Sequence, residues 1–188
     1  MHPLFAQVDW KDGSLNVEGV RTSVKKLSQL KGIFGDEQAR SQMDPETVVY
    51  RVWWWEPVEL GTTGGLLWGT TEILPGRVGD EYFMTHGHRH VIRDRAEFYG
   101  TVSGSGMLVL SDASGKSWVE EMTPGSLHYI AGHVAHRTVN TGDTPLRFMA
   151  CWPSDAGHDY DIRGENGFRV RIVEEHGQPI VSPIQQFA

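Results

Sequence analysis

The 188 residues suffice for one domain with a buried core, and an aromatic fraction of 10% and a charged fraction of 22% are ordinary for a globular protein. The formal net charge of -7 offers no positive field for nucleic acid or an anionic membrane surface, so we expect neither as a partner. The single cysteine, Cys151, excludes an internal disulfide, and no apolar stretch approaches the ~20 residues of a membrane span. Because the N-terminal residues also lack a signal-peptide pattern, we expect a single cytoplasmic domain over residues 1–188.

The first 45 residues are mixed and polar, and one short pattern stands out among them. Val24, Leu27 and Leu30 recur every three residues, with lysine and serine between them, which predicts a short amphipathic helix. Pro45 interrupts this pattern. We therefore expect a short helical or irregular segment before the first long strand.

The stretch 48–55 is β-branched and aromatic, which predicts a strand. It ends in Trp53, Trp54 and Trp55, and consecutive side chains of a strand point to opposite faces. One face of one barrel cannot bury all three rings, and a large exposed apolar patch commonly marks an interface. We therefore expect a homodimer in which part of this strand packs on a second copy of the chain.

From residue 66 onward, short apolar runs alternate with turn residues. Strands are expected at 66–74, 98–102, 107–110, 127–130, 146–152, 168–173 and 179–181. The sequence Gly104-Ser105-Gly106 predicts a hairpin turn between the second and third of these strands. Short strands without helices between them indicate an all-β fold, an antiparallel sandwich or barrel.

Histidine and glutamate residues at a characteristic spacing predict a metal site. His88 and His90 are two residues apart, which places both imidazoles on one face of a strand. Glu97 follows after enough residues for a turn and a return along the next strand, and His136 begins a later strand. Three imidazoles and a carboxylate on strands of one barrel could enclose one divalent ion, and they suit iron, manganese, zinc or nickel better than calcium.

The order of these residues resembles the first sequence motif of the cupin superfamily. In that motif a His-x-His pair is followed by a glutamate and, six residues later, a glycine, as His88-Arg89-His90, Glu97 and Gly104 stand here. The gap between His90 and Glu97 is longer than the common cupin gap.

The longer gap indicates a particular branch of the superfamily. Residues 79–90, 94–99, 135–143 and 155–160 are similar to the archaeal-type, cupin-fold glucose-6-phosphate isomerases. The most specific parts are the run His-Arg-Thr-Val-Asn-Thr-Gly-Asp and the run Asp-Ala-Gly-His-Asp-Tyr. The resemblance extends over roughly residues 48–175, and it implies a cupin double-stranded β-helix, a jelly-roll barrel whose core occupies that range.

The resemblance also implies a homodimeric metalloenzyme that interconverts glucose 6-phosphate and fructose 6-phosphate, with a small sugar phosphate as its partner. The residues that match the metal ligands are His88, His90, Glu97 and His136. The residues that match phosphate-binding positions are Thr71, Thr85 and the backbone of Gly87, and those that match sugar-lining positions are Tyr99, His158 and Tyr160.

Three of the metal-ligand candidates are also the catalytic candidates, namely Glu97, His88 and His136. An enediolate route needs a base, and Glu97 is the nearest carboxylate, although coordination to a metal weakens a base. A hydride shift polarised by the metal needs no base. The sequence leaves both routes open.

The chain departs from the family pattern at two positions near the expected substrate site. Trp152 stands where the family often has tyrosine, and His86 stands where lysine is common. A phenol hydroxyl and a fixed positive charge are therefore missing at these positions. Arg89 and Arg93 are expected to be solvated.

Two other functions fit the same metal-ligand pattern. One is a metal-dependent cupin dioxygenase, because three histidines and a glutamate can also hold iron that activates oxygen. The other is a non-catalytic sugar-binding cupin. Thr71, Thr85 and residues 158–160 suit a phosphorylated polyol better than an aromatic or thiol substrate, which favours the isomerase.

Overall fold

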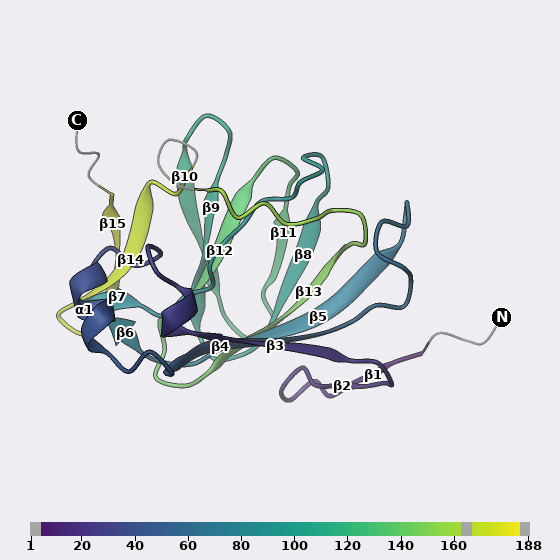
Figure 1. Cartoon of the computed structure of the whole chain (residues 1–188), viewed down its shortest axis with the longest axis horizontal. Coiled ribbons are helices and arrows are strands. Elements are labelled where there is room, and N and C mark those ends of the chain that lie inside the picture. Colours follow the sequence, from purple (N-terminus) through teal and green to yellow (C-terminus); the bar gives the residue numbers. More distant parts are fainter. Residues whose placement is uncertain (1–4, 163–166, 185–188) are drawn as a thin grey trace.

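Strands dominate the chain, which the computed structural model describes over residues 5–162 and 167–184 (Figure 1). The strands are β1 Gln7–Val8, β2 Leu15–Asn16, β3 Arg21–Lys26, β4 Val48–Trp55, β5 Leu66–Ile73, β6 Arg77–Val78, β7 Glu81–Tyr82, β8 Glu97–Ser103, β9 Gly106–Ser111, β10 Ser117–Met122, β11 Leu127–Ile130, β12 Ala135–Asn140, β13 Leu146–Pro153, β14 Val170–Glu175 and β15 Gln178–Pro183. The helical elements are a 3-10 turn, Leu27–Gln29, and α1, Glu37–Gln42. Within the described residues, no helix is long and apolar enough to cross a membrane.

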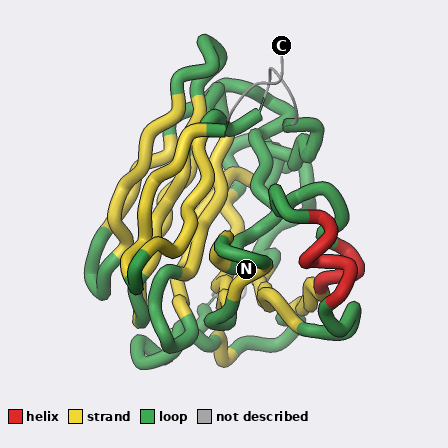
Figure 2. Tube along the Cα trace, turned by 90° about the vertical axis from the view of Figure 1, so that its left-hand side faces the viewer, coloured by secondary structure: helices red, strands yellow, loops and turns green. Residues whose placement is uncertain are grey.

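Two antiparallel sheets form the walls of a barrel. The larger has the strand order β11-β8-β13-β5-β4-β3, and the smaller has the order β10-β9-β12. Along the chain from β8 to β13 the strands pass repeatedly between the two sheets, which is the connection pattern of a jelly roll. Figure 2 shows the long strands gathered in a curved layer on one side and the helix on the opposite side. The expected all-β jelly-roll barrel is confirmed.

The core lies between the two sheets and is closed at one end by smaller elements. Leu108 on β9, Phe148 on β13 and Ile130 on β11 are at most 2% exposed and belong to one apolar cluster. A third sheet, β15-β14-β7-β6, lies near α1 at the end of the barrel (Figure 1). Burial of this cluster is the main stabilising contribution to the barrel.

The amphipathic helix expected over residues 24–30 is wrong. Val24 belongs to β3, the edge strand of the large sheet, where it lies opposite Arg51 of β4. The backbone here therefore pairs with a neighbouring strand and does not form the hydrogen bonds of a helix. Leu27 and Leu30 are fully buried, but only one 3-10 turn connects them. The three-residue spacing therefore reflects that single turn, and strand pairing overrides the local helical pattern. The one α-helix of the described residues comes later, at α1, where the Asp36 side chain accepts a hydrogen bond from the first turn.

The hairpin expected at Gly104-Ser105-Gly106 is also wrong, because the strands on either side belong to different sheets. β8 pairs with β11 and β13, whereas β9 pairs with β10 and β12. A Cβ atom on Gly104 would lie 2.5 Å from the Pro145 carbonyl oxygen, and one on Gly106 would lie 2.3 Å from the Val139 carbonyl oxygen. The two glycines therefore allow a close backbone approach at a corner of the barrel.

The three consecutive tryptophans split between the two faces of β4, as alternation requires. Trp54 lines the inner cavity of the barrel together with Val52. Trp53 and Trp55 lie outside that lining, and the Trp53 indole donates to the Gly13 carbonyl at 3.3 Å. One ring therefore serves the cavity, while the other two lie on the outer side of the large sheet.

Candidate metal centre and substrate cavity

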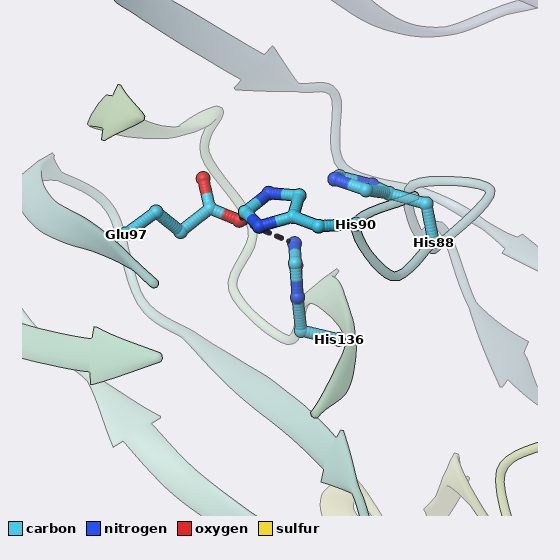
Figure 3. Close-up of side chains that lie close together, drawn as sticks. All are labelled: His88, His90, Glu97 and His136. Atoms are coloured by element: carbon cyan, nitrogen blue, oxygen red, sulfur yellow. Dashed lines mark ion pairs between the residues drawn. The ribbon is translucent and has the colours of Figure 1, made fainter. Parts of the chain in front are cut away.

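The four metal-ligand candidates converge on one point inside the barrel (Figure 3). One donor atom from each of them lies within 4.8 Å of the others; the residues are His88, His90, Glu97 and His136. Glu97 is the first residue of β8, and His136 is the second residue of β12. Two strands from opposite sheets and the segment before β8 thus supply the group.

His88 and His90 do not lie on a regular strand. His88 forms an isolated antiparallel bridge with His136, through hydrogen bonds of 3.0 and 2.9 Å between their backbones. Arg89 forms a second bridge, with Asp159. These bridges keep the segment extended, so both imidazoles still reach the same site, with ring centroids 5.7 Å apart.

The donor atoms have no other partners, which is the observation that best fits a metal. The Nε2 atoms of the three histidines and Oε1 of Glu97 are buried and have no hydrogen-bond partner in the described residues outside this group. Nε2 of His136 and Nε2 of His90 lie only 2.7 and 3.2 Å from Oε1 of Glu97. Buried polar atoms without partners are costly, and a divalent cation would satisfy all four together. This group could hold a metal.

The hydrogen bond at Nδ1 of His90 determines the tautomer of this imidazole. Its Nδ1 lies 2.8 Å from the Arg95 carbonyl oxygen, so Nδ1 must carry the proton. The Nε2 atom then presents a lone pair to the centre, as a metal-binding imidazole requires.

Burial and neighbouring charges set the protonation of the group. Burial holds the pKa of His88 well below its ordinary value. Burial would raise the pKa of Glu97, but the charges and contacts of His136, His90 and His88 outweigh it and hold that pKa well below the ordinary range. Burial lowers the pKa of His90, yet the contact with Glu97 raises it overall. An ionised carboxylate beside a neutral His88 is the state in which both can coordinate a metal.

A cavity of about 680 Å³ opens beside the four candidates. Its wall includes His88, Glu97 and His136, whereas His90 lies outside the lining. All six predicted substrate-binding residues also line it: Thr71, Thr85, Gly87, Tyr99, His158 and Tyr160. The structure therefore brings the sequence-predicted residues together in one chamber.

The phosphate-binding candidates come from two neighbouring segments. Thr71 lies on β5, next to Val52 of β4 and Phe148 of β13, and its hydroxyl makes no hydrogen bond within the described part of the chain. Thr85 is different, because its hydroxyl accepts a hydrogen bond of 3.1 Å from the Thr138 N–H. Both hydroxyls are nevertheless available at the cavity wall.

The loop that carries His158 and Tyr160 lies against the metal-ligand segment. The His158 ring is 4.3 Å from the His88 ring, measured between centroids. Asp159, between them, pairs with the Arg89 backbone and accepts a side-chain hydrogen bond of 2.7 Å from Arg93. Arg89 and Arg93 are therefore not simply solvated as expected, because both hold this loop in place through Asp159.

Several residues of the cavity wall were not predicted as site residues from the sequence, among them Tyr50. Its hydroxyl lies 3.5 Å from the His86 backbone nitrogen, and burial raises the pKa of this phenol to about 12. A signal for Tyr50 was present in the sequence. Tyr50, Val52 and Trp54 alternate along the predicted strand, so one inner residue implies the other two.

A jelly-roll barrel that gathers three imidazoles and a carboxylate beside an inner cavity is a cupin with a candidate metal centre. The family described as Glucose-6-phosphate isomerase (GPI) matches residues 24–186. The chain therefore belongs to the glucose-6-phosphate isomerase family.

Relatives from archaea and bacteria match almost the whole chain. The glucose-6-phosphate isomerase of Thermococcus litoralis is 42% identical over 181 residues, which cover 95% of this chain and 93% of the relative. That of Pyrococcus horikoshii is 42% identical over 94% of this chain and 92% of the relative. That of Sinorhizobium medicae is 38% identical over 92% of this chain and 81% of the relative.

Solved structures match a smaller part of the chain. An oxalate decarboxylase from Bacillus subtilis is 18% identical with a TM-score of 0.46, and the match covers 58% of this chain and 26% of that one. An oxalate decarboxylase from Lactobacillus farciminis is likewise 18% identical, with a TM-score of 0.45 over 59% of this chain and 30% of that one.

Proposed function

We propose that this chain interconverts glucose 6-phosphate and fructose 6-phosphate and uses one divalent transition ion per chain, either iron, manganese, zinc or nickel. The residues that would hold the ion are His88, His90, Glu97 and His136. The supporting observation is the convergence of four buried donor atoms that have no hydrogen-bond partner outside their own group in the described chain, beside a cavity whose wall carries the Thr71 and Thr85 hydroxyls. Relatives that match more than nine-tenths of this chain carry the name of this activity.

The reaction moves a hydrogen between C1 and C2 of the sugar while the carbonyl shifts between them. Negative charge develops on the oxygens of these two carbons. A divalent ion bound at the centre would supply Lewis-acid stabilisation of that charge. The residues of the chain must then orient the sugar, bind the phosphate at its far end and transfer the proton where the route needs a base.

Three polar side chains are suited to hold the sugar. Burial raises the pKa of Tyr99 well above its ordinary value and also raises that of Tyr160, so both phenols stay protonated and can donate hydrogen bonds. Burial lowers the pKa of His158, so its imidazole is neutral and offers both a donor and an acceptor. These groups would orient the sugar hydroxyls beside the metal centre.

The role of Glu97 differs between two possible routes for the hydrogen transfer. Its buried, ionised carboxylate could take the proton from the carbon and return it to the neighbouring carbon, in which case some hydrogen exchanges with solvent. A direct hydride shift would retain the hydrogen. Turnover of a sugar phosphate deuterated at C2, followed by analysis of the product, measures how much deuterium is retained.

The phosphate would bind at the end of the cavity formed by Thr71, Thr85 and Gly87. Hydroxyls and a backbone N–H group can bind a phosphate without a high net charge. Binding energy from this remote end can then position the reacting carbons.

We also propose a homodimer that uses the outer face of the large sheet. Leu66, Phe98, Leu127 and Tyr129 are exposed large hydrophobic residues on β5, β8 and β11, with exposures between 45% and 70%. The rings of Phe98 and Tyr129 pack together, 5.2 Å apart. Sedimentation at micromolar concentration is expected to report a dimer, and a clean monomer would contradict this proposal. A single domain over residues 1–188 and a cytoplasmic location stay predictions.

The activity is tested by coupling the turnover of fructose 6-phosphate to a detectable product, with and without a chelator. We expect turnover that the chelator abolishes and added metal restores. Absence of turnover in protein that contains metal would exclude the isomerase. Oxygen consumption with thiol or aromatic substrates, measured on the same sample, would then test the dioxygenase alternative.

A further inference from the structure

We propose that Arg137 is a positioning residue for the phosphate end of the substrate: its guanidinium fixes the His86–Gly87 peptide so that the Gly87 N–H points into the cavity, and it places positive charge behind that N–H. This inference rests on the proposed function, because it assigns a role within the same cavity.

Arg137 lies behind the phosphate-binding segment. It is on β12 between His136 and Thr138, so its side chain leaves the strand on the face opposite to His136. Its Nη2 atom donates a hydrogen bond of 2.8 Å to the His86 carbonyl oxygen. The guanidinium also lies over the Phe168 ring, 4.5 Å from its centroid. Two contacts on different sides therefore fix the guanidinium in place.

This hydrogen bond determines the direction of the next N–H group. In a trans peptide the carbonyl and the N–H point in opposite directions. Because the His86 carbonyl points toward Arg137, the Gly87 N–H points away from it. Gly87 lines the cavity, and its N–H has no hydrogen-bond partner in residues 5–162 and 167–184.

Glycine is required for this close approach. Gly87 has a φ of +79°, which favours glycine. A Cβ atom there would lie 3.0 Å from Cβ of Arg137 and 3.0 Å from a ring carbon of Phe168. The absence of a side chain thus lets Arg137 pack directly against the peptide that it orients.

Among the described residues, no carboxylate forms a direct ion pair with Arg137. Its Nε atom is buried and has no hydrogen-bond partner in the described parts of the chain. Glu81 influences it through charge, without a hydrogen bond between them. The charge also reaches the Tyr50 hydroxyl on the cavity wall, whose pKa it lowers against the larger effect of burial. Arg137 is a half-buried cation without a hydrogen-bonded carboxylate partner in the described chain, and an anion bound across the His86–Gly87 peptide would compensate its charge.

Inorganic phosphate is the probe for this role, because it can bind the subsite without turnover. Arg137→Met removes the charge and the hydrogen bond but keeps an unbranched apolar chain over Phe168. We expect the affinity for phosphate, measured by calorimetry, to fall by about tenfold, equivalent to ~1.4 kcal/mol. We also expect KM for fructose 6-phosphate to rise by a similar factor, while kcat and metal content change little.

Two further variants separate this role from a general effect of charge or packing. Arg147→Met removes a positive charge that pairs with Glu72 outside the cavity lining, and it is expected to leave phosphate affinity unchanged. Arg137→Lys keeps the charge but lacks the planar fork, so its phosphate affinity is expected to lie between those of the wild type and Arg137→Met.

Each outcome decides the proposal. Unchanged phosphate affinity in folded, metal-containing Arg137→Met would overturn it, as would a wild type that binds no phosphate. If Arg137→Met does not fold, the lysine variant decides, and wild-type affinity there would overturn the proposal. If the wild type binds phosphate and Arg137→Met weakens it, but neither protein isomerises the sugar phosphate, the proposed function fails while the role of Arg137 stands.

Discussion

Thr71→Val isolates one contact to the phosphate with little disturbance of the fold. Thr71 is 9% exposed on β5, and its hydroxyl makes no hydrogen bond in the described chain. Its neighbours on the paired strands are Val52 and Phe148, both apolar. Valine has nearly the shape of threonine, so it should pack there without strain, and the loss of the hydroxyl leaves no protein group unpaired.

The expected size of the effect follows from the kind of bond that is lost. A hydrogen bond to a charged group contributes about 1.5–3 kcal/mol. Since ~1.4 kcal/mol corresponds to a factor of ten, the affinity for the phosphate ester should fall roughly tenfold to 150-fold. The phosphate lies far from the reacting carbons, so the loss should appear mainly in KM and in phosphate inhibition.

Steady-state kinetics with fructose 6-phosphate, phosphate inhibition and metal analysis together test this prediction. Thr70→Val is the matched control, because Thr70 precedes Thr71 on β5 and its hydroxyl donates to the Gly13 carbonyl at 2.6 Å instead of lining the cavity. That variant should lose about 1 kcal/mol of unfolding free energy and keep its KM. Unchanged KM and unchanged phosphate inhibition in Thr71→Val would refute a phosphate contact at this residue.

Three other variants test further parts of the account. His136→Ala removes one of the four convergent donors and should sharply lower metal occupancy in elemental analysis; full occupancy would place a ligand elsewhere. Thr85→Val should weaken phosphate binding and also lower thermal stability, because it leaves the Thr138 N–H without its side-chain acceptor; a variant as stable as Thr71→Val would contradict that difference. Asp159→Asn weakens the ion pair with Arg93 that holds the loop carrying His158 and Tyr160. It should lower kcat/KM by about tenfold because these two side chains lose their fixed position, with phosphate inhibition unchanged; wild-type kcat/KM would show that the loop needs no such support.

The metal-ligand group could be predicted from the sequence because its residue types and spacing are informative by themselves. His88 and His90 share one face of an extended segment whether or not that segment is a regular strand. The return to Glu97 and the later His136 needed only a barrel that brings distant strands together. Their convergence to within 4.8 Å agrees with that interpretation, while the metal itself remains proposed.

The remaining features depend on contacts that no local pattern encodes. Leu27 and Leu30 are buried as a helical face would be, yet the preceding residues pair with β4, and only a single 3-10 turn follows, with Leu27 at its start and Leu30 just after its end. Gly104 and Gly106 predict a hairpin from the sequence, because the close contact of these glycines with the backbones of Pro145 and Val139 has no local sequence signal.

Arg137 could not be recognised from the sequence for a similar reason. Its neighbour His136 is a metal-ligand candidate, and nothing in the chain order indicates that the arginine on the opposite face reaches the His86 carbonyl. The contact exists only because the segment before β8 folds back beside β12.

The most direct test of the central claim is a titration of metal-stripped protein with a divalent transition ion while the isomerisation of fructose 6-phosphate is followed. We predict no turnover without metal, and a rate that rises in proportion to added ion and levels off at about one ion per chain. Full turnover by protein that elemental analysis shows to be free of metal would contradict it.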